Sequence, residues 1–376
     1  MMRWNALPRA VLIRLKQDPI LYASLFLAVL SAFFVPVSKE YLSYIDFRVL
    51  SLLLSLMLVV AGFKRSGAFS ILTAALLRAV HTSRALAAVL VGVCFFSSML
   101  ITNDVALITF VPLAVMLLTQ AKLQRLFIPV VALQTIAANL GSSFTPLGNP
   151  QNLYLYSLTG MHALAFLKVM ALPTIAAFAL LCVSLLFIRS DPLAVPADTG
   201  QQHIRKRRIF PWVLLFFLCL LTVLRLLPYG LVMVIVIAGV ILLDHTILWD
   251  ADYGLLLTFL FFFIFIGNLK NIPAVSAALS ALVVGRELPA GVLLSQIISN
   301  VPAAMLLSGF SQNYVALLYG VNLGGLGTLI ASMASMISYK VYSVTDHAQI
   351  GKYLAIFTGL NVAFLALLYA VVALFL

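Results

Sequence analysis

The chain has 376 residues, of which 64% are hydrophobic and only 9% are charged. Soluble domains carry about 25% charged residues, so this composition excludes a soluble globular protein and favours an all-α polytopic membrane protein. The alternating pattern of a membrane barrel is absent. The formal net charge of +12 is typical of lysine and arginine kept on the cytoplasmic side of a membrane, and we expect no nucleic acid partner.

The first element in chain order is a basic, interrupted stretch over residues 1–19, which favours a cytoplasmic segment over a cleaved signal peptide. Apolar blocks follow that are long enough to cross a hydrocarbon core of roughly 30 Å. They lie at residues 20–37, 49–63, 85–118, 126–151, 169–188, 211–227, 231–243, 253–268, 288–311, 314–338 and 353–376. Two of these blocks have a polar break near the middle, at Thr102-Asn103-Asp104 and at Ser299-Asn300.

Charge flanks predict the course of the block at 85–118. Basic residues precede it at Lys64, Arg65, Arg78 and Arg84, and others follow it at Lys122 and Arg125. Both flanks are therefore expected on the cytoplasmic side, which predicts a re-entrant helical hairpin with its tip at Asn103. This topology places 17 of the 23 lysines and arginines inside, with a cytoplasmic N-terminus and a periplasmic C-terminus.

The most polar stretch, residues 189–210, reads as a cytoplasmic linker between two halves, and its basic run would either mark topology or touch anionic lipid. We expect a first transmembrane repeat at 20–188, a connecting helix at 211–230 and a second repeat at 231–376. The single connecting crossing makes the second repeat inverted, as in many secondary transporters. The separation of 183 residues is the same for Asn139 and Asn322 as for Thr145 and Thr328, which supports this register.

The polar breaks are the candidates for a binding site. Non-helical backbone at membrane depth is tolerated only inside protein or beside a water-filled cavity. Helix N-terminal ends there favour anions, whereas C-terminal ends and unwound carbonyl groups favour cations. Asparagine, serine and threonine add donors and acceptors without a fixed charge. Two such tips that meet at the membrane midplane would form a site for a small solute and an ion.

Asp104 has two interpretations. A carboxylate in an uncharged block needs a cation, a partner or a proton, which would make it a coupling residue for sodium or protons. Aspartate is also a common helix cap. Val301-Pro302 stand in the second copy where Asp104-Val105 stand in the first, so coupling through Asp104 would be asymmetric.

Similar alternatives exist for the other polar positions. Asn103 and Asn300 are either ligands or helix caps, and their paired placement favours a site. The glycine-rich second copy, with Gly320 and Gly324 four residues apart, also fits close helix packing.

The chain has no GxxxxGK[ST] loop and no HExxH, CxxC or GxSxG pattern, so we expect neither ATP-driven transport nor an enzyme. We expect no cofactor, apart from sodium or a proton as the coupling ion.

Four segments resemble the ion transporter superfamily, which includes citrate permeases, arsenite permeases, related sodium/proton antiporters and divalent anion/sodium symporters. They read "TNDVALITFVPL", "ANLGSSFTPLGNPQNL", "SNVPAAMLL" and "GVNLGGLGTLIAS", and the resemblance covers residues 20–376. It implies two inverted repeats, each with a re-entrant hairpin and a broken helix, and a homodimer with a scaffold part and an elevator-like transport part. The binding residues it implies are Thr102, Asn103, Asp104, Asn139, Gly141, Thr145, Asn149, Ser299, Asn300, Asn322 and Thr328. The tips read "TND" and "SNV" here, whereas both tips of the carboxylate symporters read Ser-Asn-Thr.

The functional expectation is a secondary transporter of the cell inner membrane. It would move a small anion, either an organic carboxylate such as citrate or an oxyanion, with a sodium or proton gradient. The alternative in the same class is a sodium/proton antiporter or an arsenite efflux permease. The alternative of another class is a passive ion channel. The partners expected are the small anion, the lipid bilayer and a second copy of the chain.

Overall fold

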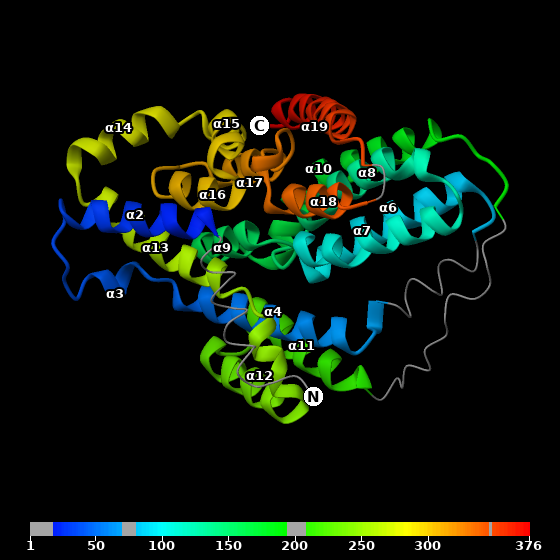
Figure 1. Cartoon of the computed structure of the whole chain (residues 1–376). Helices are drawn as coiled ribbons and strands as arrows, with labels where there is room; N and C mark the ends of the chain where they lie inside the picture. The colour runs from blue at the N-terminus through cyan, green and yellow to red at the C-terminus, as the bar shows by residue number, and fades with distance from the viewer. Residues whose placement is uncertain (1–17, 70–79, 194–207, 346–347) are drawn as a thin grey trace. The chain divides into compact units, whose positions relative to one another are not determined.

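The computed structural model describes residues 18–69, 80–193, 208–345 and 348–376 (Figure 1). Helices account for nearly all of the regular structure in these ranges, and no strand forms within them. Eight of the helices are long and apolar enough to cross a membrane. A ninth span results if α14 and α15, which meet at 108°, are counted as one bent pair. The structure confirms the predicted all-α polytopic fold.

The first half begins with helices whose N-terminal ends are capped by polar side chains. Asp18, Asp46, Thr82 and Asn149 each accept a hydrogen bond from a backbone N–H in the first turn of the following helix, as such caps do. The elements are α2 (Pro19–Ala32), α3 (Tyr41–Tyr44), α4 (Phe47–Arg65), α6 (Ser83–Ile101), α7 (Asn103–Gln120), η1 (Gln124–Leu126), α8 (Phe127–Ser142), α9 (Pro150–Thr159) and α10 (Ala163–Leu186).

The second half contains one additional helix, α11, before a similar order of elements. Its elements are α11 (Phe210–Val223), α12 (Tyr229–Asp244), η3 (His245–Asp250), α13 (Tyr253–Lys270), α14 (Pro273–Val283), α15 (Glu287–Ile298), α16 (Asn300–Ser308), α17 (Tyr314–Leu323), η4 (Leu329–Ala331), α18 (Met333–Ser343) and α19 (Ile350–Ala373). α11 and the first residues of α12 overlap the predicted connecting helix at 211–230, and the division into two repeats stays a prediction.

The predicted hairpins and broken helices are present in both halves. α6 and α7 meet at Thr102, and α15 and α16 meet at Ser299. The broken helices are α8 with α9, interrupted after Ser142, and α17 with α18, interrupted after Leu323. Both α6 and α7 are long enough to cross a membrane, so the re-entrant course of this hairpin stays a prediction. The predicted segment at 1–19 and linker at 189–210 fall mostly outside the described residues.

The chain folds as two compact units, and each unit takes segments from both halves. The first unit comprises Met1–Ser66, Arg205–Gly285 and Met305–Gln312, and the second comprises Gly67–Ile204, Arg286–Ala304 and Asn313–Leu376. All eleven predicted site residues lie in the second unit. The division by compactness therefore cuts across the division by repeat.

In the first unit, α2 lies along α13 (Figure 1). The buried amide of Asn268 on α13 donates hydrogen bonds to Ser31 Oγ and Tyr41 Oη, both at 2.9 Å. α4 packs on α11 and α12. At the end of α4, Arg65 forms ion pairs with Asp244 at 3.0 Å and Asp250 at 2.8 Å. Polar contacts thus hold α2 against α13 and the end of α4 against the end of α12 and η3.

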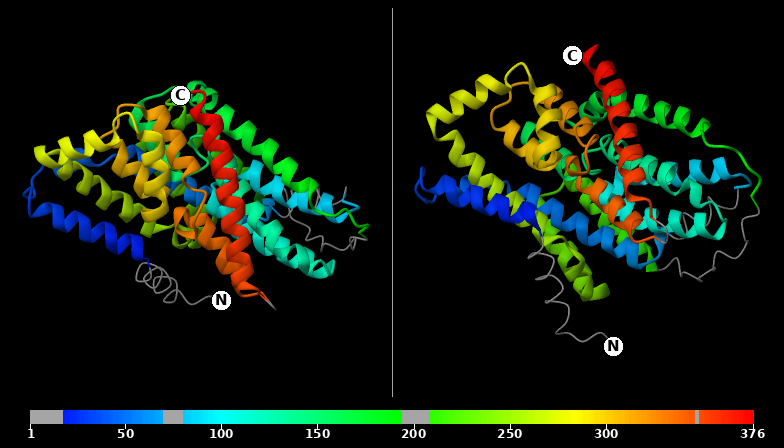
Figure 2. Two further views of the ribbon diagram at one scale, coloured as in Figure 1. Left: turned by 90° about the horizontal axis from the view of Figure 1, so that it is seen from above. Right: turned by 45° about the horizontal axis from the view of Figure 1, so that its top comes forward.

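The second unit is built around α8. Its span with η1 is 89% buried, and α6, α7, α10, α18 and α19 all pack on α8 (Figure 2). The close approach of α6 depends on Gly141, because a Cβ atom there would lie 2.1 Å from the carbonyl oxygen of Phe95. The polar residues of α8 therefore point into neighbouring helices and away from the surface.

Candidate binding site at the two hairpin tips

The two hairpin tips share an unusual backbone conformation. Thr102 has φ 73° and ψ 150°, and Ser299 has φ 72° and ψ 155°. This region is otherwise occupied almost only by glycine, and a residue with a side chain pays about 1–3 kcal/mol to adopt it. Thr102 and Ser299 are 197 positions apart, as are Asn103 and Asn300. The same strained turn thus recurs in both repeats, as expected of two halves of one site.

Asn103 connects the first tip to the broken helix of its own repeat. Its backbone N–H donates to the carbonyl oxygen of Gly148 at 3.1 Å, and its Nδ2 donates to Asn139 Oδ1 at 3.0 Å. Its Oδ1 accepts from the backbone N–H of Asp104 at 3.0 Å. The protein itself therefore satisfies the first donors of α7.

Asn139 on α8 is the centre of the polar network. Its Oδ1 accepts from Asn103 and from Ser332 Oγ at 2.9 Å, and its Nδ2 donates to the carbonyl oxygen of Gly325 at 3.4 Å. A Cβ atom on Gly325 would lie 2.9 Å from Asn300 Nδ2. Through Asn139 and Gly325, the structure brings both hairpin tips close to one network, and their role as a binding site stays a prediction.

A second set of contacts joins the two broken helices. Asn149 Nδ2 donates to Asn322 Oδ1 at 3.1 Å, and Asn322 Nδ2 donates to Asn152 Oδ1 at 2.7 Å. Asn152 Nδ2 in turn donates to the carbonyl oxygens of Ser143 at 2.9 Å and Thr145 at 3.2 Å. Asn152 is absent from the predicted site. The only signal for it is its place at the end of the motif "TPLGNPQN".

Gln296 has the corresponding role in the second repeat, and it is likewise absent from the predicted site. Its Nε2 donates to the carbonyl oxygens of Gly324 and Leu326, both at 2.9 Å. Its Oε1 accepts from the backbone N–H of Thr328 at 3.0 Å. Gly327, with φ +109°, leaves room for this side chain, because a Cβ atom there would lie 2.3 Å from Oε1. One amide side chain thus replaces the backbone partners that the broken helix lacks.

The two predicted threonines bond to hairpin arms. Thr145 Oγ1 donates to the carbonyl oxygen of Met99, and Thr328 Oγ1 donates to that of Gln296 at 3.5 Å. Met99 and Gln296 each precede their tip residue by three positions. Thr328 is exposed, in contrast to the buried asparagines. The hydrogen bonds of Thr145 and Thr328 therefore connect each broken helix to the hairpin of its own repeat.

The glycines of the second repeat pack helices together, in line with the packing interpretation of this segment. A Cβ atom on Gly320 would lie 2.6 Å from the carbonyl oxygen of Leu288, and one on Gly324 would lie 2.6 Å from Ser295 Oγ. α17 therefore approaches α15 closely along these glycines. Between them in the sequence, Asn322 belongs to the asparagine network.

The two tips differ in what they offer a ligand. Asn300 is 4% exposed and begins α16, so the backbone N–H groups of Asn300 and Val301 lie in the first turn, where a helix offers them no intrahelical partner. Pro302 contributes no N–H. The second tip is therefore a cluster of donors at a helix N-terminus. The first tip instead carries a carboxylate, Asp104, in the first turn of α7.

The fold and the site define a class of protein. Helical hairpins with strained polar tips, broken helices and a buried amide network in an apolar chain are the plan of a membrane transporter built from repeats. The chain belongs to the citrate transporter family, whose model matches residues 10–314. This family is the part of the predicted superfamily that the comparison identifies.

Individual relatives agree with this family. The inner membrane protein YbiR of Escherichia coli is 33% identical over 82% of this chain and 84% of its own length. The uncharacterized transporter MJ0456 of Methanocaldococcus jannaschii is 33% identical over 74% of this chain and 77% of its own. A putative transporter, arsB of Dictyostelium discoideum, is 28% identical over 39% of this chain and 26% of its own. The prediction of a multi-pass membrane transporter is confirmed.

Proposed function

We propose that this protein is a secondary active transporter of the cell inner membrane that moves a small anion with a sodium or proton gradient. The anion is an organic carboxylate such as citrate, or an oxyanion. The observation that carries the proposal is the N-terminus of α16 at the second tip, where Asn300 and Val301 begin the helix. The first N–H groups of a helix have no partner within the helix, and they favour a negatively charged ligand.

The first tip supplies the coupling half of the site. Asp104 is the carboxylate of this tip, and carboxylates inside membrane proteins commonly mark ion and proton pathways, so we assign to it the uptake of a sodium ion or a proton when the anion binds. Asn103 and Asn139 hold this tip beside the second one. Binding of the cation at Asp104 offsets the charge of the anion at Asn300, which makes the doubly loaded state the one that crosses the membrane.

The two units suggest how the site moves. We propose that the second unit, which contains all the predicted site residues, is the transport part, and that the first unit is the scaffold of an elevator-like transporter. A homodimer would form through the scaffold. The N-terminus would lie in the cytoplasm and the C-terminus in the periplasm, as the distribution of lysine and arginine predicts.

The alternative within this class is an arsenite efflux permease or a sodium/proton antiporter. It is favoured by the partial similarity to the Dictyostelium protein named arsB and by Asp104, which has no equivalent at the second tip. Efflux would protect cells against the toxic ion, whereas uptake would support growth on the substrate. A passive channel would instead pass current without saturable counterflow.

The experiment that tests the donor cluster is uptake of radiolabelled citrate, succinate, sulfate and arsenite by proteoliposomes with Asn300→Ala protein. We expect transport to fall at least tenfold while the protein stays in the membrane. Asn313→Ala is the matched control, because Asn313 only caps α17 through a 3.0 Å bond from the N–H of Ala316. Full transport by Asn300→Ala would contradict the assignment, and an equal loss in both variants would show a folding defect.

A further inference from the structure

A line of hydroxyl groups leads from the asparagine network along α18. Ser332, Ser335 and Ser338 are three residues apart and each is at most 1% exposed. Side chains at this spacing lie on one side of a helix. Ser332 Oγ donates to Asn139 Oδ1 at 2.9 Å, and Ser338 Oγ accepts from Thr135 Oγ1 at 2.7 Å. The middle serine therefore also faces α8, between two contacts to that helix.

Two further buried hydroxyl groups belong to this line. Ser335 Oγ is buried and has no hydrogen-bond partner among the described residues, and the buried Tyr353 Oη lies near Thr135. Tyr353 on α19 stacks on Tyr342 of α18, with ring centroids 4.6 Å apart. A buried polar atom without a partner is rare in proteins and commonly marks a bound water molecule. The seam between α8, α18 and α19 thus has a place for water.

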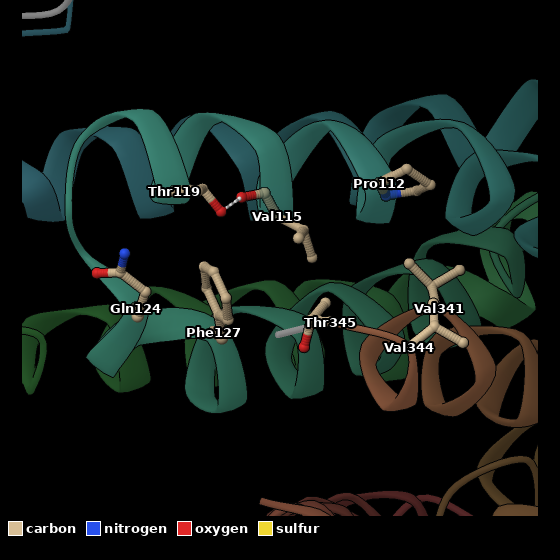
Figure 3. A pocket seen from close by; sticks show the side chains of 8 residues that line it. All are labelled: Pro112, Val115, Thr119, Gln124, Phe127, Val341, Val344 and Thr345. Carbon is tan, nitrogen blue, oxygen red and sulfur yellow. Dashed lines mark hydrogen bonds between the residues drawn. The ribbon is translucent and has the colours of Figure 1, made fainter. Parts of the chain in front are cut away.

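An open cavity of about 540 Å³ lies near the other end of α18 (Figure 3). The cavity is lined by Pro112, Val115, Thr119, Gln124, Phe127, Val341, Val344 and Thr345. Val341 is three residues beyond Ser338, which is about 4.5 Å along a helix. The neighbouring residues Lys122, Arg125 and Lys340 place this end on the face that the charge distribution predicts to be cytoplasmic.

We propose that this line, Ser332, Ser335, Ser338, Thr135 and Tyr353, is a proton route between the asparagine network and the cytoplasmic cavity. The proposal rests on the transport function proposed above and names the proton as its coupling ion. Each hydroxyl has one donor and two acceptor positions and can rotate, so a chain of hydroxyls and waters can pass a proton in either direction. The residues of the line are too tightly buried to pass the anion.

We assign the proton to the carboxyl group of Asp104, which follows Asn103 at the first tip. Its O–H bond breaks, the carboxylate re-forms, and the line delivers the proton to a water molecule in the cavity; the reverse step protonates the carboxylate. Asp104 is the only carboxyl group on α7 and on the elements packed against it, α6, α8, α18 and η1. The other titratable side chains on these elements are Arg84, Cys94, Arg125, Tyr339, Lys340 and Tyr342.

The test compares two activities of the same proteoliposomes, made with Ser335→Ala and Thr135→Val proteins. Exchange of labelled for unlabelled substrate needs no net proton movement, whereas accumulation driven by a pH gradient does. We expect accumulation to fall at least tenfold and exchange to stay within twofold of the wild type. Ser343→Ala is the matched control, because Ser343 Oγ bonds only to the carbonyl oxygen of Lys340 in its own helix.

Retention of acid-driven accumulation in both variants would overturn the proposal. Equal loss of exchange and accumulation would also overturn it, because the hydroxyls would then only hold the helices together. Absence of any substrate exchange by the wild type would instead refute the transport function itself.

A second measurement does not depend on the folding of these variants. In a Cys182→Ser background, which removes the exposed native cysteine, a Val344→Cys protein is labelled with a bulky thiol reagent. Block of accumulation with intact exchange is the expected result, and unchanged accumulation after complete labelling would contradict the route.

Discussion

Replacing Gln296 by methionine removes the amide that holds the second broken helix. Methionine has nearly the same shape and stands at the equivalent position of the first repeat, Met99. The substitution deletes the bonds to the carbonyl oxygens of Gly324 and Leu326 and to the N–H of Thr328. It leaves the size of the side chain, and so the packing of α15, almost unchanged.

The free-energy cost of the substitution depends on how deeply the groups that lose their partner are buried. Gly324 and Leu326 are buried, whereas Thr328 is exposed and its N–H regains a water partner. Two buried acceptors at about 1 kcal/mol each give about 2 kcal/mol, and membrane proteins average about 0.6 kcal/mol for each such bond. Because 1.4 kcal/mol is a factor of ten, the equilibrium constant for the ordered break falls by about sevenfold to thirtyfold.

The assay is substrate transport together with thermal unfolding in detergent. We expect Gln296→Met to lower transport about tenfold and to lower the melting temperature by a few degrees. Ile297→Met is the control, since Ile297 is the next residue on α15 and is 70% exposed. Wild-type transport and an unchanged melting temperature in Gln296→Met would refute the role assigned to this amide.

Two further substitutions test the packing of each unit. Gly141→Ala should prevent the close approach of α6 and α8, because its Cβ would lie 2.1 Å from a backbone oxygen; normal yield and a normal elution profile in size-exclusion chromatography would contradict that packing. Arg65→Gln breaks two partly exposed ion pairs worth at most about 1 kcal/mol each, so transport should persist with a small fall in melting temperature, and loss of transport would show a functional role.

The sequence predicts the helical plan well because its signals are local. The length of an apolar block predicts a membrane span, and polar or helix-breaking residues predict its interruption. The hairpin turns of the structure accordingly lie within one residue of the predicted positions, Asn103 and Asn300. The residues that carry the unusual backbone angles are the preceding Thr102 and Ser299. Their strain depends on tertiary contacts such as the bond from the N–H of Asn103 to Gly148, which no local pattern shows.

Asn152 and Gln296 belong to the polar network but are absent from the site predicted from the sequence. Each is a single amide on a regular helix, one at the end of the "GNPQN" motif and one within α15. Their importance arises because the folded chain places them against carbonyl groups of a broken helix. The division into two units has the same origin, since it depends on contacts between segments far apart in the sequence.

Charge movement by the purified protein in liposomes tests the central claim most directly. Citrate, succinate, sulfate and arsenite are applied in rapid jumps, each with sodium or with a pH step. Coupled anion transport predicts a transient current that needs one of these anions together with a cation gradient, and that is lost in Asn300→Ala. A current evoked by sodium or pH alone, with no anion requirement, would contradict the proposed function and favour a cation/proton antiporter centred on Asp104.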